Sequence, residues 1–323
     1  MKKRYKNLEK EYKVKFKEGL SIIVSMIKEK SKNSKPKYKY QVPVKYLNTK
    51  DLLNMDDYSV IRFGHSTLLF KINNEFILTD PVFSLRASPF LFLGPKRFHN
   101  SPITIEELPF IKSVIISHDH YDHLDKYSIE KLKEKVGTFY TTLEVSKHLM
   151  KFGVSRRKIV ELDWWESKIK DSVEFICTPA QHFSGRTLID KNTTLWSSWV
   201  IKTERGNFYF GADGGYFETF KEIAFNYGPF HMTFLEVGAY NKKWRDIHMM
   251  PEDSIKAHKD LKGKVLFPIH NGTFDLSLHA WDEPFDKIDK LARNNEIDIR
   301  FPIMGEEISL LEYSETSKWW RGE

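Results

Sequence analysis

Beyond residue 58 the chain alternates short apolar runs with polar turns, a pattern typical of a protein built largely from β-strands. Runs such as YSVIRF, STLLFKI, EFILT, SVIIS, VEFICT, GNFYFGA, MTFLEVGA and KVLFPIH are short and rich in β-branched and aromatic residues, as strands are. Helical patterns lie between them at 125–135 and 250–263, and the second opens with a proline and closes with a glycine, as helices prefer. Many strands with some helices predict an α/β or α+β sandwich rather than a helical bundle.

The first forty residues follow a different pattern from the rest of the chain. Apolar residues recur there at steps of three and four, with lysines between them, which predicts a basic amphipathic helix. The stripe consists of Tyr5, Leu8, Tyr12, Phe16, Leu20, Ile23 and Ile27. A polar, proline-containing linker follows at 31–43. We therefore expect an arm and linker over 1–40 and one domain over 41–323. The helix would bind an anionic membrane surface or an acidic partner, or would pack its stripe on the domain.

Charge separates the same two parts. The chain carries a net charge of +7, but residues 1–40 alone hold 14 Lys/Arg and 4 Asp/Glu, so the remainder is slightly acidic. An acidic body without a basic stripe argues against nucleic acid as the partner. No apolar stretch reaches the length of a membrane span, and no secretory cleavage pattern appears. We expect a cytoplasmic protein, with peripheral attachment to the inner face of a membrane as the arm's contribution.

Four of the apolar runs end in side chains that carry protons or bind metals. SVIIS leads into SHDHYDH at 117–123, and three later runs end at a histidine or an aspartate. The residues concerned are His118, His120, Asp122, His123, His182, Asp213 and His270. Strand ends are rigid positions next to open loops, where sheet proteins place functional groups. Core packing does not explain so many, because buried histidines and aspartates need partners.

Imidazoles and carboxylates without thiolates suit zinc and tolerate manganese or iron. The single cysteine, Cys177, excludes a site with several thiolates and lies in an apolar run typical of a buried residue. His118 and His120 alternate along an extended segment, so both side chains point the same way. Seven ligands are too many for one tetrahedral ion. They suit two ions about 3.5–4 Å apart with a bridging carboxylate.

The segment HDHYDH resembles the His-x-His-x-Asp-His signature of the metallo-β-lactamase superfamily, and the later ligands stand in the expected order. The resemblance implies an αββα sandwich with a binuclear metal site at one edge. It also implies that His118, His120 and His182 hold the first ion, that Asp122, His123 and His270 hold the second, and that Asp213 bridges them. Two Zn²⁺ ions are the expected cofactors, with Mn²⁺ or Fe²⁺ as alternatives.

Residues 60–285 more narrowly resemble the N-acyl-phosphatidylethanolamine-hydrolysing phospholipases D. The matching stretches include LTDPVFSLRASPF, GPKRFHNSP, SHDHYDHLD, TPAQHFSGRTL, GADGGYF and IHNGTF. This resemblance implies hydrolysis of a phospholipid to N-acylethanolamine and phosphatidic acid. The chain departs from the pattern at Asp119, Phe183, Asn271, Glu236, Met249 and Met250. Because these departures concern the substrate more than the metals, a soluble phosphodiester or a lactone is the alternative substrate. A homo-oligomer is compatible with either reading.

Further residues have a functional and a structural interpretation each. Asp122 would orient the attacking hydroxide, and Asp213 would hold the two ions together. His248, in RDIHMMPEDS, is the candidate general acid or phosphate contact, or else a surface residue at a helix entry. Tyr121 would touch substrate or cap its loop, and Arg186 would pair with phosphate or form a surface salt bridge. Asp80 and His65 would each lie near the site or be structural.

Overall fold

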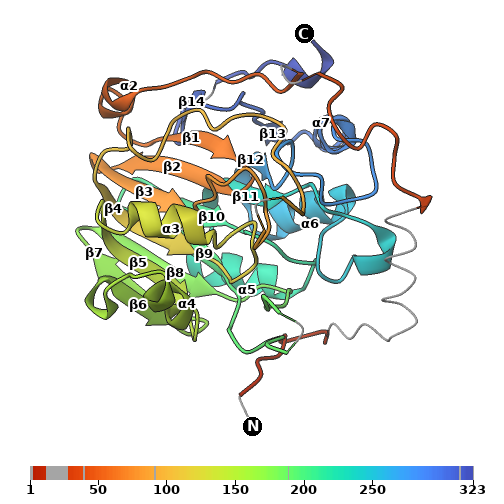
Figure 1. Ribbon diagram of the computed structural model, residues 1–323. Coiled ribbons are helices and arrows are strands. Elements are labelled where there is room, and N and C mark those ends of the chain that lie inside the picture. The colour runs from red at the N-terminus through yellow and green to blue at the C-terminus, as the bar shows by residue number, and fades with distance from the viewer. Residues whose placement is uncertain are drawn as a thin grey trace.

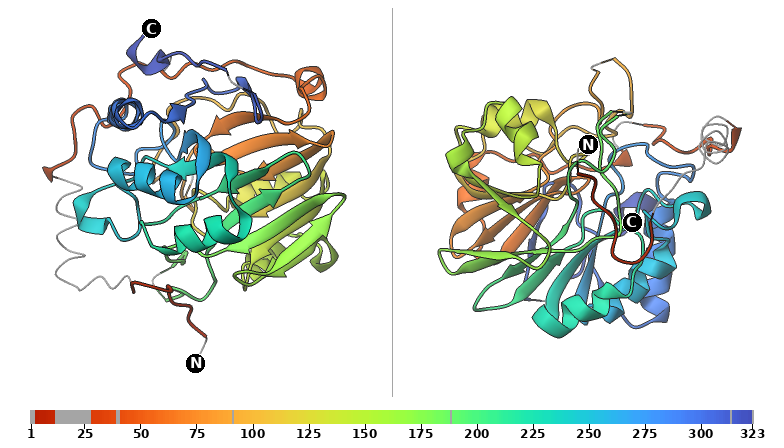
Figure 2. Two further views of the ribbon diagram at one scale, coloured as in Figure 1. Left: turned by 180° about the vertical axis from the view of Figure 1, so that it is seen from behind. Right: turned by 90° about the horizontal axis from the view of Figure 1, so that it is seen from below.

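The computed structural model of the chain describes residues 3–11, 28–38, 41–90, 92–187, 189–312 and 314–322. Two seven-stranded mixed sheets pack face to face, and helices cover their outer faces (Figure 1; Figure 2). The αββα sandwich expected from the sequence is therefore confirmed.

The first sheet has the strand order β14-β1-β2-β3-β4-β5-β6. Strands β14, β1, β2 and β3 pair antiparallel, whereas β3 to β6 pair parallel. The strands are β1 (Ser59–Gly64), β2 (Thr67–Ile72), β3 (Glu75–Thr79), β4 (Ile111–Ile116), β5 (Val136–Thr142), β6 (Ile159–Leu162) and β14 (Glu307–Ser309). The neighbouring helical elements are α2 (Thr49–Leu53), α3 (Lys126–Leu132), α4 (Ser146–Lys151) and η2 (Arg156–Lys158).

The second sheet has the order β13-β12-β11-β10-β9-β8-β7. Its β10 to β13 half is parallel and its β7 to β10 half is antiparallel. The strands are β7 (Ser167–Lys170), β8 (Val173–Thr178), β9 (Ser198–Lys202), β10 (Asn207–Phe210), β11 (Phe230–Glu236), β12 (Gly263–Ile269) and β13 (Asp298–Ile299). The helical elements are α5 (Thr219–Tyr227), η3 (Lys242–Trp244), α6 (Pro251–Asp260), α7 (Glu283–Asn294) and η4 (Trp319–Arg321).

The main core lies between the two sheets. Phe70 of β2 meets Phe234 of β11 edge to face, with ring centroids 5.1 Å apart, and Trp199 of β9 is fully buried nearby. Two further apolar clusters lie between each sheet and its helices, so every residue of β1 and β2 is buried. Strands covered on both faces read as near-continuous apolar runs, which explains why the sequence pattern located them. Cys177 is buried in the inter-sheet core, as expected.

The N-terminal arm differs from its predicted helix where the structure describes it. Residues 3–11 form an extended strap on the domain rather than a helix, and the rest of the predicted stripe up to Ile27 lies outside the described residues. The strap is held by pairing: Tyr5 N donates to Asn192 O, and Glu9 accepts from Thr219 N at the start of α5. These long-range hydrogen bonds override the local helical periodicity, so the helix prediction is wrong for this segment. No helix among the described residues combines the length and apolarity needed to span a bilayer.

Candidate metal centre

The histidines and aspartates at the strand ends converge at one edge of the sandwich. The loop after β4 brings His118 to His123, and β8, β10 and β12 are followed by His182, Asp213 and His270 respectively. All seven predicted ligands belong to groups whose ligand atoms lie within 4.8 Å of one another. Their assignment as ligands remains a proposal, but the structure brings the whole predicted set together.

The first group joins three imidazoles. His118 Nε2 lies 2.8 Å from His120 Nδ1, and His182 Nε2 lies 3.2 Å from the same atom. The other nitrogens of two rings are engaged, because His118 Nδ1 lies 2.9 Å from Ser117 Oγ and His182 Nδ1 lies 2.9 Å from Ile247 O. Burial lowers the pKa of His118 and of His182 well below the usual value. Both rings are therefore held neutral, the form that binds a metal.

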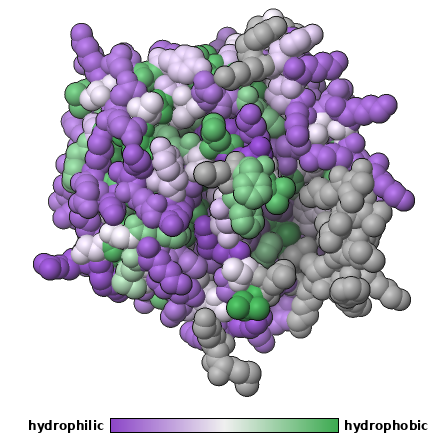
Figure 3. Space-filling model, in the orientation of Figure 1, coloured by the Kyte–Doolittle hydropathy of each residue, from purple (hydrophilic) through white to green (hydrophobic). Residues whose placement is uncertain are grey.

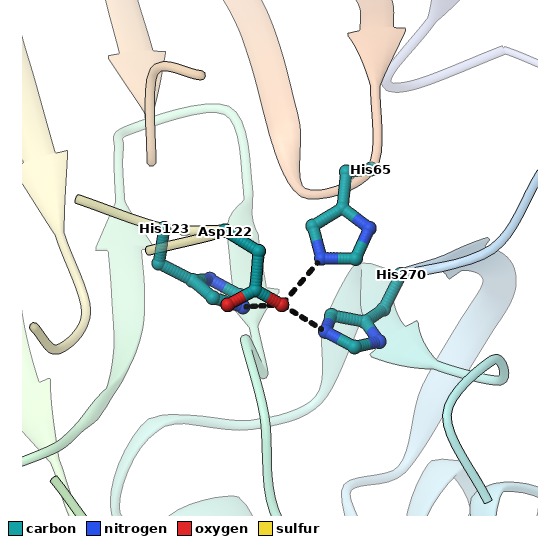
Figure 4. Close-up of side chains that lie close together, drawn as sticks. All are labelled: His65, Asp122, His123 and His270. Atoms are coloured by element: carbon teal, nitrogen blue, oxygen red, sulfur yellow. Dashed lines mark hydrogen bonds and ion pairs between the residues drawn. The ribbon is translucent and has the colours of Figure 1, made fainter. Parts of the chain in front are cut away.

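The second group surrounds Asp122 and contains a histidine that the sequence did not assign to the site. Asp122 Oδ2 lies 3.1 Å from His65 Nε2, 3.3 Å from His270 Nε2 and 3.7 Å from His123 Nε2 (Figure 4). His65 comes from the turn between β1 and β2, stands alone in the sequence, and has a φ of 52°. The structural and the site interpretation of His65 thus coincide: the residue is buried and faces the cluster.

Asp213 lies between the two groups. Its Oδ1 is 3.1 Å from His123 Nε2, and its Oδ2 is 3.1 Å from His270 Nε2 and 3.8 Å from His182 Nε2. His123 Nε2, His270 Nε2 and Asp213 Oδ1 are nevertheless buried without a geometrically acceptable hydrogen bond. Buried polar atoms without partners are rare and need an explanation. A divalent cation among these atoms would supply one, so the residues present fit a metal centre.

The electrostatics of the cluster point the same way. Burial would lower the pKa of His123 and His270, but Asp213 and neighbouring carboxylates raise the first well above its usual value and the second to about 10. Burial would likewise raise the pKa of Asp122 and Asp213, but His123 brings both well below the usual value. The carboxylates therefore create a strongly negative potential, which favours protonation of His123 and His270 when no metal is bound. A divalent cation would replace those protons.

A buried aspartate orients one of the candidate ligands. Asp80 is fully buried at the end of β3 and accepts from Ser117 N at 2.8 Å and Ser117 Oγ at 2.6 Å. Its Oδ2 also lies 2.7 Å from His123 Nδ1. An Nδ1–H donated to this carboxylate leaves the Nε2 lone pair of His123 aimed at the cluster. Asp80 thus lies next to the site and also links β3 to the segment after β4 through Ser117.

Glu236, one of the departures from the family pattern, is paired with His248. Glu236 is only 1% exposed, yet three donors surround it: His248 Nδ1 at 2.7 Å, Met249 N at 2.9 Å and Gly214 N at 3.2 Å. Burial would lower the pKa of His248, but the Glu236 carboxylate raises it. His248 is therefore held by Glu236 beside the cluster, in surroundings that favour its cationic form, and only 15% of its side chain is exposed. The sequence showed the unexpected carboxylate without revealing its partner.

Tyr121 and Arg186 contact each other. Tyr121 Oη donates to Arg186 O at 3.0 Å, and the guanidinium lies 3.9 Å from the centre of the Tyr121 ring. Arg186 Nη1 also donates to Asp119 O and Leu124 O, on either side of the ligand loop. In this arrangement Arg186 braces that loop. A contact of either residue with substrate remains a prediction.

A pocket of about 250 Å³ opens beside the cluster and has two unlike walls. The polar wall consists of His120, Asp122, Asp213, His248 and His270. The apolar wall consists of Phe183, Ala239, Trp244, Ile247 and Leu276. Such a lining combines side chains that attract charge with side chains that exclude water.

Comparison with known proteins agrees with this geometry. Residues 75–271 match the profile of the beta-lactamase superfamily domain. The chain is 42% identical over 266 residues to an uncharacterised protein of Mycobacterium tuberculosis, covering 80% of this chain and 70% of the relative. It is 31% identical over 268 residues to N-acyl-phosphatidylethanolamine-hydrolyzing phospholipase D 1 of Caenorhabditis elegans, covering 79% and 75%. Among solved structures, Igni18, a metallo hydrolase of Ignicoccus hospitalis, aligns with a TM-score of 0.59 at 21% identity, covering 77% and 97%.

Proposed function

The chain belongs to the metallo-β-lactamase superfamily, and from that premise we propose that it is a zinc-dependent phosphodiesterase of the phospholipase D type. The substrate would be N-acyl-phosphatidylethanolamine or a related phospholipid, and the products N-acylethanolamine and phosphatidic acid. The superfamily is one of metal-dependent hydrolases, which supports hydrolysis as the reaction class. A relative that is named for this lipid reaction and is 31% identical over 79% of the chain supports the narrower substrate.

The observation that carries the lipid assignment is the apolar wall of the pocket. Phe183 packs against His120 with ring centroids 4.6 Å apart, and Trp244, Ile247 and Leu278 form an apolar cluster with Phe183 beside the polar wall. A small soluble phosphodiester has no surface that would benefit from such a wall. An acyl chain does, at about 0.8 kcal/mol for each buried CH₂ group.

The roles of the chain's own residues follow from their positions. Two divalent ions held by His118, His120 and His182, and by Asp122, His123 and His270, with Asp213 between them, would supply a nucleophile at neutral pH and offset phosphoryl charge. Zinc suits the nitrogen and oxygen donor set.

The leaving alkoxide needs a proton, and His248 is the proposed source. Glu236 holds its Nδ1 and favours the cationic ring, so the other nitrogen is available to the pocket that the residue lines. Asp122 would orient the attacking group, and Tyr121 and Arg186 would contact the headgroup.

The test compares lipid and soluble substrates with one zinc-loaded preparation. Dispersed N-acyl-phosphatidylethanolamine should release N-acylethanolamine and phosphatidic acid, detected by mass spectrometry, and Asp213→Asn should abolish the release. Hydrolysis of a small phosphodiester or a lactone, without any cleavage of the lipid, would overturn the phospholipase assignment and favour the soluble alternative. Identical turnover by Asp213→Asn would exclude this cluster as the site.

A further inference from the structure

Two loops place large apolar side chains in solvent next to the candidate metal centre. The loop from Ser84 to Arg97 exposes Leu85 (65%), Phe90 (51%), Phe92 (80%) and Leu93 (61%), and the loop after β8 exposes Ile189 (84%). We call these five residues the apolar rim. Soluble proteins rarely gather exposed apolar side chains in one area, and where they do, the area is a binding surface.

The two loops project together. In the view from below, the loop after β3 and the loop after β8 extend from the same edge of the sandwich, with the N-terminal strap beside them (Figure 2, right). Apolar side chains gather near the centre of the face that both loops cross (Figure 3). The two segments that carry the apolar rim therefore lie at one edge of the sandwich.

Hydrogen bonds close turns in the described parts of both loops. In the first loop, Arg97 N donates to Leu85 O at 2.9 Å and Ala87 N donates to Pro95 O at 3.1 Å. In the second, Asp190 Oδ1 accepts from Arg186 N and Thr187 N at 3.0 and 2.7 Å. These bonds close turns at the base of the segments that expose Phe90, Phe92 and Ile189.

The apolar rim adjoins the pocket. The second loop also carries Phe183, which lines the pocket's apolar wall. The first loop is anchored at its base by Phe98 N, which donates to Thr273 O at 2.8 Å, within the segment that carries His270 and Leu276. A molecule held by the rim would thus be next to the entrance of the pocket.

The charges around the rim suit an anionic surface. Between residues 81 and 99 the basic side chains that are at least partly exposed are Arg86 and Lys96, since Arg97 is buried, and no Asp/Glu occurs there. The strap at 3–11 adds four Lys/Arg against two Glu. A phospholipid headgroup layer combines phosphate charge outside with an apolar interior beneath. Aromatic and aliphatic side chains flanked by lysines and arginines match both layers.

We propose that the apolar rim inserts into an anionic phospholipid bilayer and delivers lipid to the pocket from that surface. This inference rests on the proposed lipid substrate and adds the surface by which the protein reaches it. Basic neighbours would provide long-range attraction, and the rim would bury its side chains in the headgroup region. The interfacial contact would be independent of the metals.

The experiment measures binding to sucrose-loaded vesicles of phosphatidylcholine and phosphatidylglycerol in a three-to-one mixture, with chelator present to prevent turnover. The double variant Phe90→Asp with Phe92→Asp should lower the partition coefficient by about tenfold or more, because each change puts a carboxylate where an apolar ring enters lipid. Lys96→Gln should weaken binding about fivefold on these vesicles and leave binding to pure phosphatidylcholine unchanged. Phe225→Asp is the matched control, because Phe225 is 84% exposed on α5 in the outer helix layer.

The result that overturns the proposal is equal binding by the wild type, the rim variant and the Phe225 control, or no vesicle binding by the wild type. Loss of self-association in the rim variant, without any change in vesicle binding, would assign the surface to a second copy and also overturn it. Turnover of a short-chain monomeric substrate should be the same in the rim variant and the wild type. Rim-dependent binding without lipid cleavage would refute the phospholipase function alone, and equal cleavage of vesicle lipid by the rim variant would refute the rim alone.

Discussion

Asp80→Asn should weaken metal binding through His123 without removing any candidate ligand. The Asp80 carboxylate lies 2.7 Å from His123 Nδ1 and fixes the tautomer that leaves Nε2 as a lone-pair donor. An asparagine at this position keeps an acceptor for Ser117 N, but its amide group replaces the oxygen that faces the imidazole. A donor facing Nδ1 favours the tautomer with the proton on Nε2, which points that proton into the cluster.

The size of the effect follows from the bonds that change. Outer-shell carboxylates that orient a histidine typically contribute 10- to 100-fold to metal affinity, about 1.4–2.7 kcal/mol. Asp80 makes one contact with His123, is itself fixed by two hydrogen bonds from Ser117 and has no exposed surface, so we expect the upper part of this range. The loss should affect one ion more than the other, because the imidazoles of His118, His120 and His182 make no contact with Asp80 among those described.

Competition with a chromophoric chelator measures both dissociation constants, and elemental analysis gives the stoichiometry. Asp125→Asn is the control: Asp125 is also a buried aspartate bonded to serines, accepting from Ser84 Oγ at 2.8 Å and Ser128 Oγ at 2.5 Å. Both variants should lose stability of about 1–2 kcal/mol from their missing charged hydrogen bonds. The reasoning is refuted if Asp80→Asn binds both ions like the wild type, or if Asp125→Asn loses as much affinity.

Three further results are expected. Asp213→Asn should lower bound metal from about two ions per chain and reduce phosphodiester hydrolysis at least about 100-fold, and elemental analysis with two ions still bound would contradict it. Asn7→Ala should weaken metal binding about tenfold, because Asn7 pairs with both His182 N and His182 O; Asn7→Asp, which keeps the acceptor, should lose less. Burial lowers the pKa of His258 to about 4. Above the unfolded pKa near 6.5 the ring is neutral in both states and does not change the free energy of unfolding, but between pH 6.5 and 4 only the unfolded state takes up the proton, so stability falls. His258→Gln should remove about 3 kcal/mol of that acid sensitivity in urea unfolding.

The sequence predicted the strand architecture and the seven-residue cluster because both have local signatures. Strands buried on both faces leave apolar runs, and a ligand at the end of such a run is placed by the strand itself. His118 and His120 show this, since their alternation and their position after β4 are both visible in the sequence. The prediction of an αββα sandwich needed the family resemblance in addition, because apolar runs do not determine strand order.

The residues that the sequence could not place are those defined by distant partners. His65 is separated from Asp122 by 57 positions, and no spacing rule connects the two. Asn7 bonds to His182 across 175 positions, so the strap's attachment could not be read from a helical period of three and four. Local propensity is a weak guide where side chains pair with a preformed surface. The misassigned helix at 3–11 is the consequence.

The division of the pocket into a polar and an apolar wall links these contacts to the choice of substrate. Burying the Glu236 carboxylate is costly unless it is paired, and three donors offset that cost only because His248 and two backbone amides converge on it. The polar wall is therefore held in place by these bonds, and Ile247 of the apolar wall directly precedes His248 of the polar wall in the sequence. A soluble phosphodiester would use the first wall and leave the second exposed to water. The proposed phospholipid would satisfy both at once, and Phe183 and Ile189, both in the loop after β8, would connect the apolar wall with the apolar rim.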